Sequence, residues 1–191
     1  MSSQEELSLI RDCQNGNLAS FSKLYDFYLD KIYRFVYYRV SHKETAEDLS
    51  SQTFLKALKA IDSADFSEKN FSAWVYKIAY NLIIDYYRSD KKEVELDKVL
   101  DLSAKENLLE KVDKNKKIEL IKKAMTCLSP KQRDVVIMRV WDELSYKEIS
   151  EISGDSEENC KVIFSRAVSK LKENLPIEYF VLLFALNILK N

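Results

Sequence analysis

The sequence predicts an all-α protein made of two small helical domains that are joined by a charged linker. Only 2 glycines and 2 prolines occur among 191 residues, so chain reversals are few and long helices are favoured. Apolar residues recur at the spacing of amphipathic helices, and serine-based capping motifs mark several helix starts. We place the first domain at residues 1–92, the linker at 93–114, the second domain at 115–175 and an apolar tail at 176–191.

The first domain is expected to be a bundle of helices around an aromatic core. Gly16 fits the C-terminal cap of the first helix, and Ser41 with Glu44 forms a capping box that starts the third. The other helices cover residues 4–15, 18–40 and 71–92. The apolar stripes predict a core made of Phe21, Leu24, Tyr25, Tyr28, Ile32, Phe35, Val36, Leu49, Thr53, Phe54, Ala57, Leu58, Ile61, Phe71, Val75, Ile78, Ala79 and Leu82.

The polar side of the third helix contains one apolar residue. Glu44, Asp48 and Gln52 share this side with Leu55. An apolar side chain on a polar face is a weak indication of a protein contact. A singly exposed leucine is common on protein surfaces, so this pattern alone favours no partner.

The fourth helix has a second stripe beside its core stripe. It carries Trp74, Lys77, Asn81, Asp85 and Arg88 at spacings of three and four. Cations suit phosphates, rings stack on unpaired bases and an amide can bond base edges, so the stripe suits single-stranded nucleic acid. An amphipathic helix with a half-buried tryptophan explains the same spacing equally well.

The second domain ends in a predicted helix-turn-helix, a motif whose second helix usually contacts DNA. Ser129 and Pro130 start the helix that covers residues 130–143. Ser145 with Glu148 forms a capping box, Gly154 supplies the turn and Ser156 caps the last helix. That helix has the apolar stripe Cys160, Ile163, Phe164, Ala167, Val168 and Leu171, and its outward side carries Glu158, Val162 and Ser165 between Lys161 and Arg166.

Composition argues against tight, unaided DNA binding. The net charge is -1 and the pI about 6.0, whereas proteins that bind DNA alone usually have a basic face or a high pI. Cys13, Cys127 and Cys160 lie far apart in apolar helical patterns, so we expect buried free thiols and no disulfide or metal site. No signal peptide opens the chain, and its longest apolar run, residues 179–189, is too short to span a bilayer, which favours a cytoplasmic protein.

Three stretches, taken together and in order, resemble the sigma factors of bacterial RNA polymerase. "TAEDLSSQTFLKAL" (residues 45–58) is similar to the acidic polymerase-binding segment of that family. "FSAWVYKIAYNLIIDYYR" (71–88) is similar to the segment that recognises and melts the −10 element. "LSPKQRDVVIMRVWDELSYKEISEISG" (128–154) resembles region 4, which contacts the −35 element. The chain is most similar to the short extracytoplasmic-function (ECF) type, which keeps only regions 2 and 4.

The resemblance implies a protein that binds core RNA polymerase and directs promoter-specific initiation. Such a protein is not an enzyme and needs no cofactor, metal or small-molecule substrate. The implied polymerase contacts are Glu47, Asp48, Gln52 and Leu55. The implied contacts with the unwound −10 strand are Trp74, Lys77, Asn81, Asp85 and Arg88, with an unstacked base held between residues 61–70 and this helix. The implied −35 contacts are Lys147, Glu158, Lys161, Val162, Ser165 and Arg166.

The last helix departs from the family pattern. The family commonly has Thr, Val, Ser and Arg where this chain has Asn159, Cys160, Val162 and Ile163. Without the Thr and the Arg, contacts with DNA phosphates are lost, so we expect weak binding to the −35 element. Tight binding of the isolated second domain to promoter duplex would contradict this expectation.

Two other functions stay open from the sequence. One is a helix-turn-helix regulator that never contacts polymerase, and the other is a sigma-like interaction module that has lost promoter recognition. The apolar tail "IEYFVLLFALNILKN" (177–191) adds further possibilities. It could pack on the second domain, dimerise, bind an anti-sigma protein or touch a membrane surface.

Overall fold

The structure is a computed structural model that describes residues 1–66, 70–89, 124–178 and 180. Within these ranges every regular element is a helix, which confirms the all-α prediction. The chain divides into two compact units, the first made of Met1–Glu93 with Ser150–Gly154 and the second of Val94–Ile149 with Asp155–Asn191. The predicted linker and most of the predicted tail lie outside the described residues, and the domain boundaries given above stay predictions.

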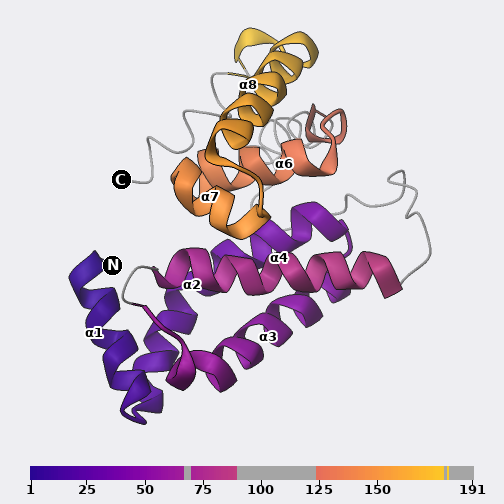
Figure 1. Cartoon of the computed structure of the whole chain (residues 1–191). Coiled ribbons are helices and arrows are strands. Elements are labelled where there is room, and N and C mark those ends of the chain that lie inside the picture. Colours follow the sequence, from indigo (N-terminus) through magenta and orange to yellow (C-terminus); the bar gives the residue numbers. More distant parts are fainter. Residues whose placement is uncertain (67–69, 90–123, 179, 181–191) are drawn as a thin grey trace, which may run out of the picture. The chain divides into compact units, whose positions relative to one another are not determined.

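The first unit is a helical bundle. Its elements are α1 (Ser3–Gln14), α2 (Leu18–Val40), α3 (Lys43–Ala60), the 3-10 turn η1 (Ile61–Ser63) and α4 (Phe71–Ser89). The long helix α2 packs against α1, α3 and α4, and α3 also packs against α4 (Figure 1). Both α3 and α4 also carry exposed residues, which on α4 are Asn81, Asp85, Arg88 and Ser89.

The core of this unit is aromatic, as the sequence predicts. Of the predicted core residues only Tyr25, Leu58 and Ile78 are half-buried, and all the others are buried. The rings of Phe35 and Tyr76, which lie on α2 and α4, are 5.3 Å apart between centroids. Contacts of this kind hold α2 and α4 in a fixed register, since edge-to-face ring pairs add directional attraction to the burial of apolar area.

The start of α3 differs from the prediction. Ser41 has φ 54°, ψ 21°, so it ends α2 in the left-handed conformation, and its N–H donates to the Tyr37 carbonyl at 2.8 Å. His42 is extended and caps α3 by accepting the Thr45 N–H on Nδ1 at 3.3 Å. An N-cap residue needs an extended backbone, so the predicted capping box of Ser41 and Glu44 is wrong.

Replacing Ser41 by glycine is therefore expected to stabilise the first unit by about 0.5–1 kcal/mol, because glycine adopts a positive φ without the cost that a Cβ adds. Denaturant unfolding of the full chain measures this gain. Ser41→Ala serves as the control and should not stabilise. A loss of stability in Ser41→Gly would show that the hydroxyl contributes more than the backbone strain costs.

The predicted helix-turn-helix is present, and most of it lies in the second unit. Its elements are α6 (Pro130–Val136), the π-helical segment η3 (Ile137–Trp141), α7 (Tyr146–Ser153), whose last residues group with the first unit, and α8 (Glu157–Asn174). The predicted single helix over 130–143 therefore ends at residue 141 and is π-helical in its last part. The predicted caps at Ser129, Ser145 and Ser156 are confirmed, and Gly154 takes φ +78° in the turn.

The cysteines are free thiols, and two of them are buried as predicted. Cys13 and Cys160 are buried, but Cys127 is half-exposed and its Sγ–H donates to the Ala124 carbonyl at 2.8 Å. Burial raises the pKa of the Cys13 thiol. No group of three or more His, Cys, Asp or Glu side chains suited to a metal occurs among the described residues. In the same part of the chain, no helix is both long enough and apolar enough to cross a membrane.

Candidate functional site

The outward side of α3 brings together the residues predicted to contact polymerase. Glu47, Asp48 and Gln52 are exposed on this helix. Leu55 is 56% exposed, one turn beyond Gln52. Lys43 lies 3.8 Å from Glu47, and both side chains remain largely open to solvent. This side of α3 therefore carries acidic and amide side chains together with one exposed apolar side chain, and the exposed Lys56 and Lys59 follow it.

On α4, Trp74 lies in an aromatic cluster. Its ring centroid is 5.2 Å from that of Phe66 and 5.6 Å from that of Phe71, and Trp74 itself is half-buried. Phe71 is fully buried and fixes the cluster to the core. The sequence places Phe66 only in a loop, so its contact with Trp74 is information that the structure adds.

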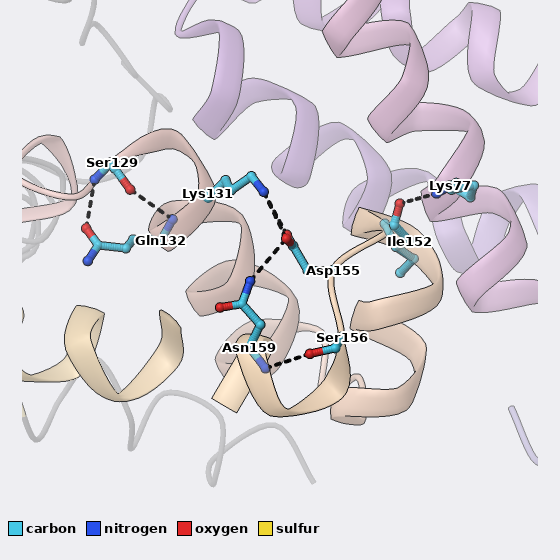
Figure 2. Close-up of polar contacts among 8 residues, drawn as sticks. All are labelled: Lys77, Ser129, Lys131, Gln132, Ile152, Asp155, Ser156 and Asn159. Carbon is cyan, nitrogen blue, oxygen red and sulfur yellow. Dashed lines mark hydrogen bonds and ion pairs between the residues drawn. The ribbon is translucent and has the colours of Figure 1, made fainter. Parts of the chain in front are cut away.

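The rest of the predicted α4 stripe is open to solvent towards the end of the helix. Asn81, Asp85 and Arg88 are exposed, and the Arg88 guanidinium lies 4.0 Å from the Asp85 carboxylate. Lys77 is half-buried, and its ammonium donates to the Ile152 carbonyl at 2.6 Å, both residues belonging to the first unit (Figure 2). A phosphate contact by Lys77 would therefore replace this hydrogen bond.

A cavity of about 470 Å³ lies beside the loop that follows α3. It is lined by α1 residues Leu7, Ile10, Arg11 and Gln14 and by residues 62–66. Gln14 fixes the loop, since its amide donates to the Ile61 and Ala64 carbonyls at 3.1 and 2.9 Å. The predicted base-binding position lies between this loop and α4, whereas this cavity opens on the α1 side.

The outward side of α8 carries most of the residues predicted to contact the −35 element. The exposed members are Glu158, Lys161, Val162, Ser165 and Arg166, and Lys147 is exposed near the start of α7. The Lys161 ammonium donates to the Glu157 carboxylate at 2.9 Å, and this hydrogen bond raises the pKa of Lys161. The Tyr146 ring lies 6.0 Å from the Phe164 ring and so joins the start of α7 to α8.

A polar network fixes the start of α8 to α6. Asp155 accepts from the Lys131 ammonium at 2.9 and 3.0 Å and from the Asn159 side-chain amide at 3.1 Å (Figure 2). Its side chain is only 17% exposed, so solvent screens these contacts weakly. Asn159 N–H in turn donates to the Ser156 cap. Lys131 and Asp155 are 24 residues apart, a distance at which no sequence pattern indicates the pair.

Replacing Asp155 by alanine is expected to destabilise the second unit by about 1–1.5 kcal/mol, because it removes a shielded ion pair and the Asn159 bond. Thermal unfolding followed by Trp141 fluorescence in a Trp74→Phe background measures the loss, since the chain has 2 tryptophans and Trp141 is the one in this unit. Glu158→Ala is the matched control, an exposed acid in the same turn, and should cost less than about 0.5 kcal/mol. Equal losses would show that Asp155 acts only through its helix-end charge.

Two family models of known proteins match this chain. Residues 24–93 match the family model for Sigma-70 region 2, and residues 118–171 match that for Sigma-70, region 4. The ECF RNA polymerase sigma factor BldN of Streptomyces coelicolor is 34% identical over 177 residues, which cover 89% of this chain and 66% of BldN. The ECF RNA polymerase sigma factor SigM of Bacillus subtilis is 33% identical over 154 residues, 80% of this chain and 93% of SigM. This chain belongs to the ECF sigma factors.

ECF sigma factors are transcription initiation factors of RNA polymerase, so the family suggested by the sequence is confirmed. A solved relative has the same architecture. The sigma factor RpoE from Bartonella quintana, in a co-crystal structure with the anti-sigma factor NepR, has a TM-score of 0.66 and 25% identity, and the alignment covers 82% of this chain and 97% of that one. In this ECF sigma factor, every predicted site residue lies inside one of the two matched ranges.

Proposed function

We propose that this ECF sigma factor binds core RNA polymerase through the outward side of α3, unwinds and recognises the −10 element with α4, and contacts the −35 element with α7 and α8. The proposal rests on Leu55, which is 56% exposed on an otherwise polar side of α3. It lies within the match to region 2, next to exposed Asp48 and Gln52. An exposed leucine in this setting suits a surface that a protein partner covers.

The contact on α3 combines one apolar anchor with polar groups that set its orientation. Burying a leucine side chain contributes roughly 1.5–3 kcal/mol. Gln52 and Asp48 lie one and two turns before Leu55, respectively, and can bond the partner on the same side. Glu47 already has Lys43 as a neighbour at 3.8 Å, so it would exchange one cation for another on binding.

The outward side of α4 suits an unwound strand. Unstacking DNA costs a few kcal/mol per step, and stacking of a base on an aromatic ring returns about 1–3 kcal/mol. Trp74 and Phe66 supply rings, exposed Asn81 can bond a base edge, and Arg88 can bond a phosphate. Asp85 lies 4.0 Å from Arg88, and this pairing weakens the repulsion between Asp85 and the strand.

The proposed partners are core RNA polymerase, promoter DNA and an anti-sigma protein, with the cytoplasm as the place of action. The anti-sigma partner is proposed because the solved relative RpoE is bound to the anti-sigma factor NepR. A net charge of -1 is compatible with promoter binding when polymerase holds both regions near DNA, since tethering raises their effective concentration.

Run-off transcription on two templates tests the proposal. One template is a fully paired promoter fragment, selected from genomic fragments with core polymerase and this protein, and the other has a mismatched bubble over its −10 element. Asn81→Ala should transcribe poorly from the paired template and better from the bubble, because the bubble removes the cost of melting. Leu55→Asp should fail on both, since it blocks polymerase binding. If the wild type initiates from no fragment although it binds polymerase, promoter recognition by this chain is ruled out.

A further inference from the structure

We propose that Val162 recognises the C5-methyl group of a thymine in the major groove of the −35 element. The inference rests on the proposed function. It adds the chemical class of the base that α8 selects and assigns that choice to one side chain.

Val162 contributes little to the core of its own unit. It is 45% exposed in the second turn of α8, whereas the buried side of the helix consists of Cys160, Ala167 and Leu171. A helix that recognises DNA contacts base edges with residues near its N-terminus. Val162 lies one turn after Glu158, which is in the first turn, and both are exposed on the outward side. It is therefore placed where a recognition helix reaches the floor of the groove.

The groups around Val162 favour a polyanion over an apolar partner surface. Lys161 precedes it and Arg166 follows one turn later, and both are exposed. Phosphate contacts position a protein on DNA, while the side chains between them face the bases. The two cations are therefore placed to contact the phosphates that flank the groove, with the apolar residue facing the bases.

The chemistry of the valine side chain limits which base it can recognise. Valine has no donor or acceptor, and the thymine methyl is the major-groove feature that an apolar side chain distinguishes. Glu158 accepts hydrogen bonds and so favours the amino group of cytosine or adenine. Four residues advance a helix by about 6 Å, which is close to two base steps of about 3.4 Å. The thymine and the amino-bearing base are therefore expected within about two base pairs of each other.

Replacement of thymine by deoxyuridine tests the proposal, because deoxyuridine lacks only the methyl group. Holoenzyme made from the full chain and core polymerase first selects promoters from a library with a randomised −35 element upstream of a fixed −10 element. Each selected thymine is then replaced in turn. We expect one replacement to slow open-complex formation about three- to four-fold, the effect of removing one methyl from an apolar contact. Val162→Ser, which lacks both methyl groups of valine, should remove this sensitivity, and Ser169→Ala should keep it.

Each of three other outcomes would overturn a part of the proposal. If every deoxyuridine is tolerated while base-pair changes in the −35 element still slow initiation, the methyl contact is wrong and −35 recognition stands. If Val162→Ser keeps the same sensitivity as the wild type, another residue contacts the methyl. If the library shows no −35 preference at all, the −35 part of the proposed function fails together with this inference.

Discussion

Replacing Leu55 by aspartate is expected to weaken binding to core RNA polymerase by about 30-fold or more, while the melting temperature of the sigma factor changes by less than about 3 °C. The leucine is 56% exposed, so its removal opens no cavity in the first unit. In the interface with polymerase, however, the variant loses about 1.5–3 kcal/mol of apolar burial and introduces an unpaired carboxylate. Titration of labelled protein with core polymerase measures the affinity.

Leu18 provides the matched control for this substitution. It is 70% exposed at the start of α2, and it lies outside the residues that match region 2. Leu18→Asp makes the same chemical change and should leave the affinity for polymerase unchanged. Equal loss of binding in both variants would show a general effect of added negative charge, and unchanged binding in Leu55→Asp would remove the α3 contact from the proposed function.

Replacing Arg133 by methionine is expected to destabilise the second unit by about 2–4 kcal/mol and to lower its melting temperature by more than about 10 °C. Arg133 is only 5% exposed. Its guanidinium donates to the Met125 carbonyl at 3.2 Å and to the Leu128 carbonyl at 3.5 Å. Methionine fills similar space but donates no hydrogen bond, so these carbonyls would lose a donor in a place that water reaches poorly. Trp141 fluorescence in the Trp74→Phe background reports the transition.

Arg166→Met is the control, since it removes an exposed guanidinium from the same unit. Its melting temperature should stay within about 3 °C of the parent. Arg133→Lys should lie between the two, because it keeps one cation but not the planar fork that serves two carbonyls. If Arg133→Met melted like Arg166→Met, the hydrogen bonds of Arg133 would contribute little to the stability of the second unit.

Local patterns explain why most helix starts of this fold could be predicted. The boxes of Ser129 with Gln132 and of Ser145 with Glu148 depend on residues three apart, so the sequence contains the whole motif. At Ser41 the sequence also fits a capping box, but the residue ends α2 in the left-handed conformation instead. Only the backbone conformation distinguishes these two roles. The π-helical segment at residues 137–141 has no signal in the spacing of apolar residues.

The exposed residues of the candidate site follow helical spacing and could be assigned to faces from the sequence. Asp48, Gln52 and Leu55 on α3 and Glu158, Val162 and Ser165 on α8 are exposed as expected. Contacts between distant residues could not be assigned in the same way. The pair of Lys131 with Asp155 and the ring contact of Phe66 with Trp74 depend on how helices and loops meet. Roles in binding polymerase and promoter stay predictions for each of these residues.

The pairing of cations with neighbouring acids has a consequence for binding in different salts. DNA binding gains free energy when cations on the protein displace condensed counterions. The logarithm of the binding constant therefore falls by roughly 0.9 per contacted phosphate for each unit rise in the logarithm of the salt concentration. Lys161 and Arg88 each face an acid, at 2.9 and 4.0 Å. Each would exchange this internal partner for a phosphate, so the net number of ions released is smaller than the number of phosphates contacted. Promoter complexes of this sigma factor would therefore tolerate changes in ionic strength better than those of a strongly basic DNA-binding protein.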